Sequence, residues 1–263
     1  MKILSLDSSG MVASAALLTD EILTAEYTLN HKKTHSQTLM SMLDEIVRMT
    51  DWDLESVDAI AIAKGPGSFT GLRIGSAAVK GLAHALDKPV VEVPTLEAMA
   101  YQAYGYMGLI APIMDARRSQ VYTAAYTFDE KGKFTCLMES SALSVEEFVS
   151  KLKEFGRPVM LMGDGVPVYE EKIRSLMHDG FDVNDRTAGS DITDGEVDKS
   201  EGSDVCDILI APPHMNRQRA ASVAALGALY VKEGKTVSAA QHTPLYLRKP
   251  QAERELEAGL LKT

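Results

Sequence analysis

Short apolar runs alternate with amphipathic stretches along the first part of the chain. Three apolar runs near the N-terminus predict strands joined by short turns, at residues 2–7, 12–18 and 22–29. The pattern that follows predicts a helix, a strand, a helix, a strand and a helix, at residues 34–50, 58–63, 69–86, 89–93 and 95–104. The order βββαβαβα predicts an α/β fold.

The pattern of the first two strands recurs further along the chain. The stretches ILSLDSSGMVASAALLTDE and IAPIMDARRSQVYTAAYTFDE both contain an apolar strand that ends in aspartate, at Asp7 and Asp115. In both, a short polar turn, a strand of small residues and a closing Asp-Glu pair follow. With the length of 263 residues, this weak repeat predicts two duplicated α/β lobes, 1–102 and 103–263, with a C-terminal segment that packs back on the first lobe.

A glycine-rich segment, KGPGSFTGLRIG at residues 64–75, lies between a predicted strand and a predicted helix. It lacks the Lys-Ser/Thr pair of a Walker loop, and its glycines do not have the spacing of the dinucleotide-binding fingerprint. The segment instead predicts a tight turn followed by a helix that Ser68 or Thr70 caps.

Composition narrows the function classes. The formal charge of -10 disfavours a broad nucleic-acid-binding face. The sequence shows no apolar run of membrane-spanning length and no secretory leader, and its two cysteines, Cys136 and Cys206, fit a reducing cytosol. Much of the negative charge lies in residues 185–207, which hold eight acidic and two basic residues. We expect a flexible surface insertion there, the alternative being an acidic docking site.

Six stretches of the chain, in this order, resemble the TsaB family, formerly called YeaZ: ILSLDSS, KGPGSFTGLRIG, GLAHALDKPVVEVPTLEAMA, MDARRSQVYTAAY, MGDG and PLYLRKPQAE. The resemblance covers nearly the whole chain except the acidic insertion. It implies the two-lobed fold of the actin, Hsp70 and sugar-kinase superfamily, with a duplicated α/β architecture and mixed βββαβα sheets.

The TsaB resemblance also implies a function. Members of this family are the non-catalytic partners of TsaD, which installs N6-threonylcarbamoyladenosine beside the anticodon of tRNAs that read codons beginning with A. TsaD transfers the group from threonylcarbamoyl-AMP, and the ATPase TsaE resets the complex. The resemblance therefore implies a cytoplasmic scaffold that meets TsaD, TsaE and, through the complex, tRNA, and that can form a homodimer when alone. The alternative is an active ATP-dependent transferase or kinase of the same fold.

The sequence offers little for a metal site. The TsaD relatives hold a metal with histidines on the helix that corresponds to 95–104, and this stretch contains no histidine here. His31 and His35 have the spacing of metal ligands, but metal sites usually need a third ligand and supporting groups. We expect these two histidines to be solvated or to lie in an interface, and we expect no bound metal.

The turn after the first strand is where superfamily relatives contact phosphate. Here it consists of Asp7, Ser8 and Ser9, and Asp115 is the counterpart of Asp7. A turn of this kind offers backbone N–H groups to an anion, but aspartates also commonly end strands without binding anything. The resemblance implies at most a vestigial phosphate loop and no cofactor, and the adenosine-binding motif of the second lobe is reduced to MGDG. We identify no catalytic residue and no H-E-x-x-H peptidase motif.

The helix at 69–86 has only two fixed charges, Arg73 and Lys80, so little of its surface favours water. Either it is buried within the fold, or one side meets the core and the other meets a partner. Gly75 and Ala78 share a face, and small residues allow close helix–helix approach. Because the family pairs through first-lobe helices, we expect an interface with TsaD that includes His35, Leu39, Met42, Leu43, Ile46, Leu72, Ile74, Gly75, Ala78, Val79 and Leu82.

Overall fold

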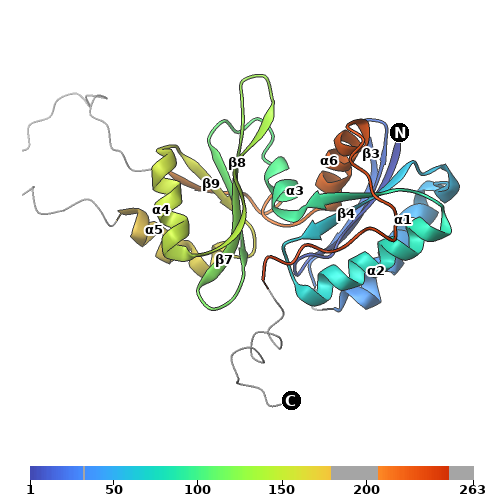
Figure 1. Cartoon of the computed structure of the whole chain (residues 1–263), viewed down its shortest axis with the longest axis horizontal. Coiled ribbons are helices and arrows are strands. Elements are labelled where there is room, and N and C mark those ends of the chain that lie inside the picture. Colours follow the sequence, from blue (N-terminus) through green and yellow to red (C-terminus); the bar gives the residue numbers. More distant parts are fainter. Residues whose placement is uncertain (32, 179–206, 249–263) are drawn as a thin grey trace, which may run out of the picture.

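The fold is taken from a computed structural model of the chain, which describes residues 1–31, 33–178 and 207–248. Two lobes lie side by side, and each contains a five-stranded sheet with helices on both faces (Figure 1). The acidic insertion expected at 185–207 lies, apart from Asp207, outside the described residues.

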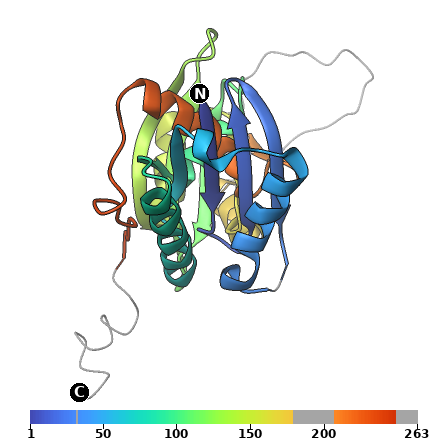
Figure 2. The same ribbon diagram turned by 90° about the vertical axis from the view of Figure 1, so that its right-hand side faces the viewer.

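The first lobe follows the order expected from the apolar pattern. Its strands are β1 (Lys2–Asp7), β2 (Ala13–Thr19), β3 (Ile22–Leu29), β4 (Ala59–Gly65) and β5 (Val90–Pro94). Its sheet has the order β3-β2-β1-β4-β5. Helices α1 (His35–Thr50) and α2 (Phe69–Ala85) contact one face of this sheet, and a short 3-10 turn, η1 (Leu54–Ser56), precedes β4 (Figure 2).

The second lobe repeats this arrangement. Its strands are β6 (Leu109–Asp115), β7 (Gln120–Phe128), β8 (Phe134–Ser144), β9 (Val159–Met162) and β10 (Ile208–Ile210). Its helices on the corresponding face are α4 (Val145–Phe155) and α5 (Val166–His178). The sheet order, β8-β7-β6-β9-β10, matches that of the first lobe strand for strand. The predicted duplicated α/β architecture with two mixed sheets is thus confirmed.

The repeated pair of strands identified in the sequence is also confirmed. β1 pairs antiparallel with β2 and parallel with β4, and β6 pairs antiparallel with β7 and parallel with β9. Asp7 and Asp115 therefore end equivalent strands, and the turn that follows each lies at the same edge of its sheet.

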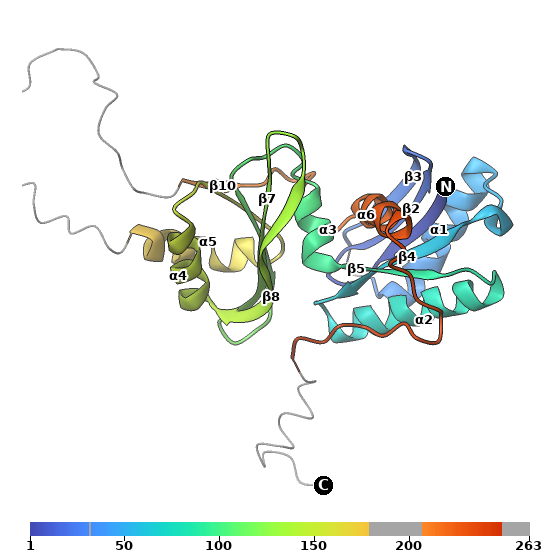
Figure 3. The same ribbon diagram turned by 45° about the horizontal axis from the view of Figure 1, so that its top comes forward.

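Two further helices cover the opposite faces of the sheets and join the lobes. α3 (Thr95–Tyr101) lies between them and contacts β4 and β5 as well as β6 and β7. It is shorter than the predicted helix at 95–104, because turns begin at Gln102. α6 (Ala220–Lys232) follows β10, returns to the first lobe and packs on β1, β2 and β4 (Figure 3).

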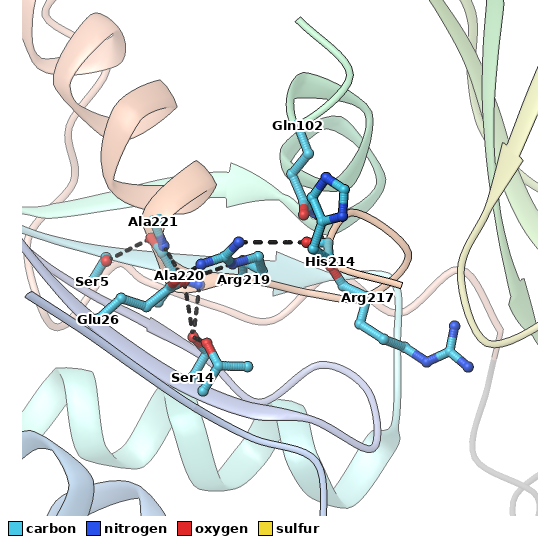
Figure 4. Close-up of polar contacts among 10 residues, drawn as sticks. Ser5, Ser14, Glu26, Gln102, His214, Arg217, Arg219, Ala220 and Ala221 are labelled. Atoms are coloured by element: carbon cyan, nitrogen blue, oxygen red, sulfur yellow. Dashed lines mark hydrogen bonds and ion pairs between the residues drawn. The ribbon is translucent and has the colours of Figure 1, made fainter. Parts of the chain in front are cut away.

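Glu26 on β3 holds the start of α6 in place (Figure 4). Its carboxylate accepts hydrogen bonds from the Arg219 side chain and from the backbone N–H of Ala221 at 3.1 Å. The backbone N–H of Ala220 donates to Ser14 Oγ at 2.9 Å. Arg219 occupies the N-cap position without a side-chain cap bond, so β2 and β3 supply the acceptors that the helix end needs. These groups are mutually satisfied and form a structural anchor.

After α6 the chain forms an irregular strap, residues 235–248, which runs beside α2 toward the second lobe (Figure 1). Val237 exchanges two backbone hydrogen bonds with Val90 on β5, and the N–H of Leu245 donates to the Lys64 carbonyl at 2.7 Å. At the end of the strap, Arg248 Nη1 donates to the carbonyl of Ala116 in the second lobe at 2.6 Å. The strap therefore ties the edge of the first lobe to the turn after β6.

Candidate functional site

A cavity of about 340 Å³ lies between the lobes, and residues of the turns after β1 and β6 line it. Five segments that are distant in sequence line it: these two turns, the glycine-rich segment before α2, the turn after β9, and the end of the strap. In a two-lobed fold of this kind the space between the lobes is the first place to look for a ligand.

The turn after β1 is closed to solvent. The carboxylate of Asp7 is 1% exposed and accepts hydrogen bonds from the N–H of Ser9 at 2.8 Å and from Ser9 Oγ at 2.6 Å. Burial raises the pKa of Asp7 to about 6, although the bonds from Ser9 oppose that rise. Ser8 Oγ donates to the carbonyl of Gly71 at 2.9 Å, so its hydroxyl also has a partner within the protein.

The glycine-rich segment covers this turn. The N–H of Ser68 donates to the carbonyl of Ser9 at 2.7 Å. A Cβ at Gly67 would overlap that same carbonyl, and a Cβ at Gly71 would overlap the carbonyl of Ser8, so only glycine permits this close approach. Ser68 caps α2 by accepting from the N–H of Gly71, which confirms the predicted helix start. The segment packs on the Asp7–Gly10 turn and covers Asp7, while Ser9 and Gly10 still line the cavity.

His31 and His35, which have the spacing of metal ligands in the sequence, lie in different surroundings. His31 is exposed, whereas His35 begins α1 and makes a hydrogen bond through Nε2 to the carbonyl of Gly10 at 2.8 Å. This bond fixes His35 on the same turn that α2 covers. Within the described ranges, no cluster of three or more His, Cys, Asp and Glu side chains is arranged to hold a metal ion.

The turn after β6 is built differently. The carboxylate of Asp115 accepts hydrogen bonds from the N–H of Arg117 at 2.8 Å and from the Tyr169 hydroxyl at 2.9 Å. Arg117, Arg118 and Ser119 all have left-handed backbone angles, with φ of 64°, 56° and 56°. The side chain of Arg117 is 88% exposed and lies 3.4 Å from Asp115, at the opening of the cavity.

The predicted remnant of the adenosine motif, MGDG, forms the turn between β9 and α5. Asp164 Oδ1 accepts from the N–H of Asp115 at 3.2 Å, and burial raises the pKa of Asp164. Gly163 is held from the other side, because its N–H donates to Asn216 Oδ1 at 2.6 Å and its carbonyl accepts from Arg217 at 3.1 Å. In Figure 4 the Arg217 side chain extends away from the Glu26 cluster, toward this second-lobe turn.

Sequence reasoning missed four residues that line the opening of the cavity: Phe69, Arg117, Tyr246 and Arg248. The rings of Phe69 and Tyr246 lie 4.9 Å apart, and Arg73 Cζ lies 3.9 Å from the centre of the Phe69 ring. The only sequence signals were the DARRS and LYLRK stretches, in which arginines stand beside a strand end or an aromatic residue.

Comparison with known proteins identifies the family. A family model described as "TsaD: tRNA N6-adenosine threonylcarbamoyltransferase" matches residues 23–256. The TsaB protein of Bacillus subtilis, described as a tRNA threonylcarbamoyladenosine biosynthesis protein, is 35% identical over 67% of this chain and 77% of its own length. The chain belongs to the TsaB family. The Escherichia coli TsaB is 28% identical over 97% of this chain and 98% of its own length.

A solved TsaB-family structure supports the fold. YeaZ from Pseudomonas aeruginosa superposes with a TM-score of 0.71 and 26% sequence identity, covering 94% of this chain and 99% of that chain. None of the helices in the described part of the chain has the length and apolar character needed to cross a membrane.

The sequence predicts that α1 and α2 present eleven residues to a partner. Most of these side chains point into the first lobe instead. The buried ones, all part of the first-lobe core or its sheet contacts, are Leu39, Met42, Leu43, Ile46, Leu72, Gly75 and Val79. A Cβ at Gly75 would overlap Ser8 Oγ, so this glycine faces the Asp7–Gly10 turn rather than a partner. The remaining four, which are partly exposed, are His35, Ile74, Ala78 and Leu82.

Proposed function

We propose that this chain acts in the biosynthesis of threonylcarbamoyladenosine on tRNA, as the non-catalytic partner of a TsaD-type transferase. Its relatives carry the name of a tRNA threonylcarbamoyladenosine biosynthesis protein, and the family model that it matches describes the transferase. In this proposal a TsaE-type ATPase completes the set, tRNA reaches the chain through the complex, and the site of action is the cytoplasm.

The closed turn after β1 carries the non-catalytic part of the proposal. An active kinase or transferase of this fold needs a carboxylate that can reach phosphate or its metal ion. Here Asp7 is buried, is bonded to Ser9 and lies under the glycine-rich segment. A role for Asp7 in phosphate chemistry would require α2 to move away from the turn, at the cost of the contacts that the glycines make.

The outward sides of α1 and α2 are the surface proposed for the transferase. On α2 the exposed positions include Ala77, Gly81 and Ala85, which are four residues apart and so follow one side of the helix. A Cβ at Gly81 would meet no atom within 4 Å, so this side is open in the single chain. On the neighbouring α1, Met40 is 45% exposed. Small residues and methionine suit close packing against another helix.

Reconstitution tests the function directly. The purified chain, a TsaD-type transferase, a TsaE-type ATPase, tRNA and threonylcarbamoyl-AMP are combined, and each protein is omitted in turn. We expect threonylcarbamoyladenosine to form only when both this chain and the transferase are present. The chain alone should hydrolyse no ATP. ATP turnover by the chain alone that Asp7→Asn abolishes would favour the active-enzyme alternative.

Variants on α2 test the proposed surface. Ala77→Glu puts a carboxylate on the outward side, and a buried unpaired charge should weaken transferase binding by about 10-fold or more. The melting temperature of the chain alone should not change, because residue 77 is exposed. Ser150→Glu, on the exposed side of α4 in the second lobe, is the matched control and should bind normally. Normal transferase binding by Ala77→Glu would contradict the assignment of this side of α2 to the transferase. If a second copy of this chain occupied the surface instead, the chain alone would form a concentration-dependent dimer.

A further inference from the structure

Positive charge gathers at the opening of the cavity between the lobes, although the chain as a whole has a formal charge of -10. Arg117, from the turn after β6, and Arg248, from the end of the strap, line the cavity. Arg73, from the first turns of α2, does not line it but lies on the ring of Phe69, which does. Arginines that meet at one place in an acidic protein create a local field that attracts anions. We call this surface, formed by Phe69, Arg73, Arg117, Tyr246 and Arg248, the basic–aromatic mouth.

The contacts that hold two of these arginines leave their charge available. Arg248 donates to the neutral carbonyl of Ala116, and Arg73 lies over the Phe69 ring. Within the described ranges, neither forms an ion pair with a carboxylate. Arg117 does face a carboxylate, that of Asp115, but Asp115 also accepts from Tyr169 and from the Arg117 N–H. Asp164, the other acid that lines the cavity, is bonded to the Asp115 N–H.

The backbone fixes Arg117 at the opening. Three successive residues with left-handed φ form a tight reversal between β6 and β7, closed by hydrogen bonds between Ala116 and Gln120 and between Arg117 and Gln120. Arg248 binds the carbonyl of Ala116 within this reversal. Two arginines from segments far apart in sequence are therefore held together before any ligand arrives.

Two aromatic rings stand beside these charges. Phe69 and Tyr246 both line the cavity, their ring centres are 4.9 Å apart, and Tyr246 is 37% exposed. The Arg73 guanidinium lies on the Phe69 ring at 3.9 Å. Proteins that bind single-stranded nucleic acid combine arginines for the phosphates with aromatic faces for the bases. An acidic peptide would use the arginines but would leave the aromatic faces without a matching partner.

We infer that the basic–aromatic mouth binds a single-stranded segment of RNA, with phosphates on Arg117 and Arg248 and a base against Tyr246. The inference rests on the proposed function, which supplies tRNA as the RNA. Arg73 belongs to α2, so the mouth adjoins the surface proposed for the transferase, and a tRNA held by the transferase could reach both proteins.

The test measures tRNA binding by the complex of this chain with the transferase, separately from product formation. Arg117→Glu should weaken tRNA binding by about 10-fold and lower the slope of log affinity against log salt by about one. Tyr246→Ala should weaken it by about 5-fold or more, whereas Tyr246→Phe keeps the ring and should bind as the wild type does. Lys131→Glu, with the same charge change at the exposed turn between β7 and β8, should change binding less than about 2-fold.

A photo-crosslinking residue at position 246 gives a second readout. It should form an adduct with tRNA that excess single-stranded oligoribonucleotide prevents and that ATP at equal concentration does not. Competition by ATP alone would assign the mouth to a small nucleotide and overturn the inference. Normal tRNA affinity for Arg117→Glu and Tyr246→Ala, with no adduct, would also overturn it. If the wild-type complex then still needed this chain to make threonylcarbamoyladenosine, the proposed function would stand and only the RNA contact would fail.

Discussion

The turns after β1 and β6 occupy equivalent places in two lobes of the same topology, yet one is closed and the other is open. Asp7 is 1% exposed and is satisfied by Ser9 within its own turn. Asp115 lies at the cavity, where it binds Tyr169 and faces the exposed Arg117. The acid of the first turn is withdrawn from the cavity, whereas the second turn presents charged side chains to it.

The difference comes from where the following glycine-rich turn packs. In the first lobe, Gly67 contacts the carbonyl of Ser9, two residues beyond Asp7. In the second lobe, Gly163 and Gly165 contact the carbonyl of Ile113, two residues before Asp115. The covering segment thus lies over the turn in one lobe and over the end of the strand in the other. A small shift in packing decides whether a duplicated strand–turn–strand unit can meet a ligand.

The packing of α2 on the turn after β1 should be disrupted when a side chain is added between them. Gly71→Ala puts a Cβ against the carbonyl of Ser8, and because backbone cannot yield cheaply, we expect the free energy of unfolding to fall by about 2 to 4 kcal/mol. Gly81→Ala in the same helix meets no atom within 4 Å and should gain about 0.5 to 1 kcal/mol from helix propensity. Urea unfolding of both variants checks this. Equal effects at the two positions would mean that α2 does not press on the turn.

The buried acid should make the two turns respond differently to pH. Because the pKa of Asp7 rises from 3.8 unfolded to about 6 folded, the native state holds this proton more tightly. The stability that this bound proton contributes is therefore lost as the pH rises from about 3.8 through about 6. Asp7→Asn removes the titration, so its unfolding free energy relative to the wild type should improve by about 2 kcal/mol between pH 4.5 and 7.5.

Asp115→Asn is the matched variant for this pH comparison. Asp115 lies in the partly exposed turn, and its side chain keeps an oxygen that can accept from Tyr169 after the substitution. We expect it to lose about 1 kcal/mol or less. If the difference in unfolding free energy between Asp7→Asn and the wild type stayed constant across pH, Asp7 would ionise as freely in the folded protein as in the unfolded chain.

The open turn depends on the strap. Arg248→Ala removes the hydrogen bond to the carbonyl of Ala116, and we expect a loss of about 1 kcal/mol in unfolding free energy. Arg48→Ala, which removes an exposed pair with Glu45 on α1, should cost about 0.5 kcal/mol or less. If the two variants were equally stable, the strap would not brace the second-lobe turn, and the comparison would rest on α2 alone.

The sequence predicted the order of strands and helices in the first lobe and the duplication of its first two strands, because both depend on local apolar periodicity. It did not predict which side of α2 meets the core. That helix is apolar or small on every side, so Gly75 and Gly81 look alike in sequence, although only Gly75 lies against Ser8. Nor did it predict that Arg248 and Ala116 meet, because the strap has no periodic pattern and its contacts join distant segments. Such contacts depend on the packing of the whole chain.

The smallest expected effect on stability comes from a difference in backbone conformation between the two turns. Ser119 has a left-handed φ of 56°, whereas no residue of the Asp7–Gly10 turn has a positive φ. A side chain in this conformation carries a steric cost that glycine avoids, partly offset by the greater freedom of glycine in the unfolded chain. Ser119→Gly should therefore raise the unfolding free energy by about 0.5 kcal/mol, while Ser119→Ala, which keeps the Cβ, should not. If Ser119→Ala raised the unfolding free energy as much as Ser119→Gly does, the gain would come from removal of the serine hydroxyl. The turn after β6 would then carry no backbone strain at Ser119.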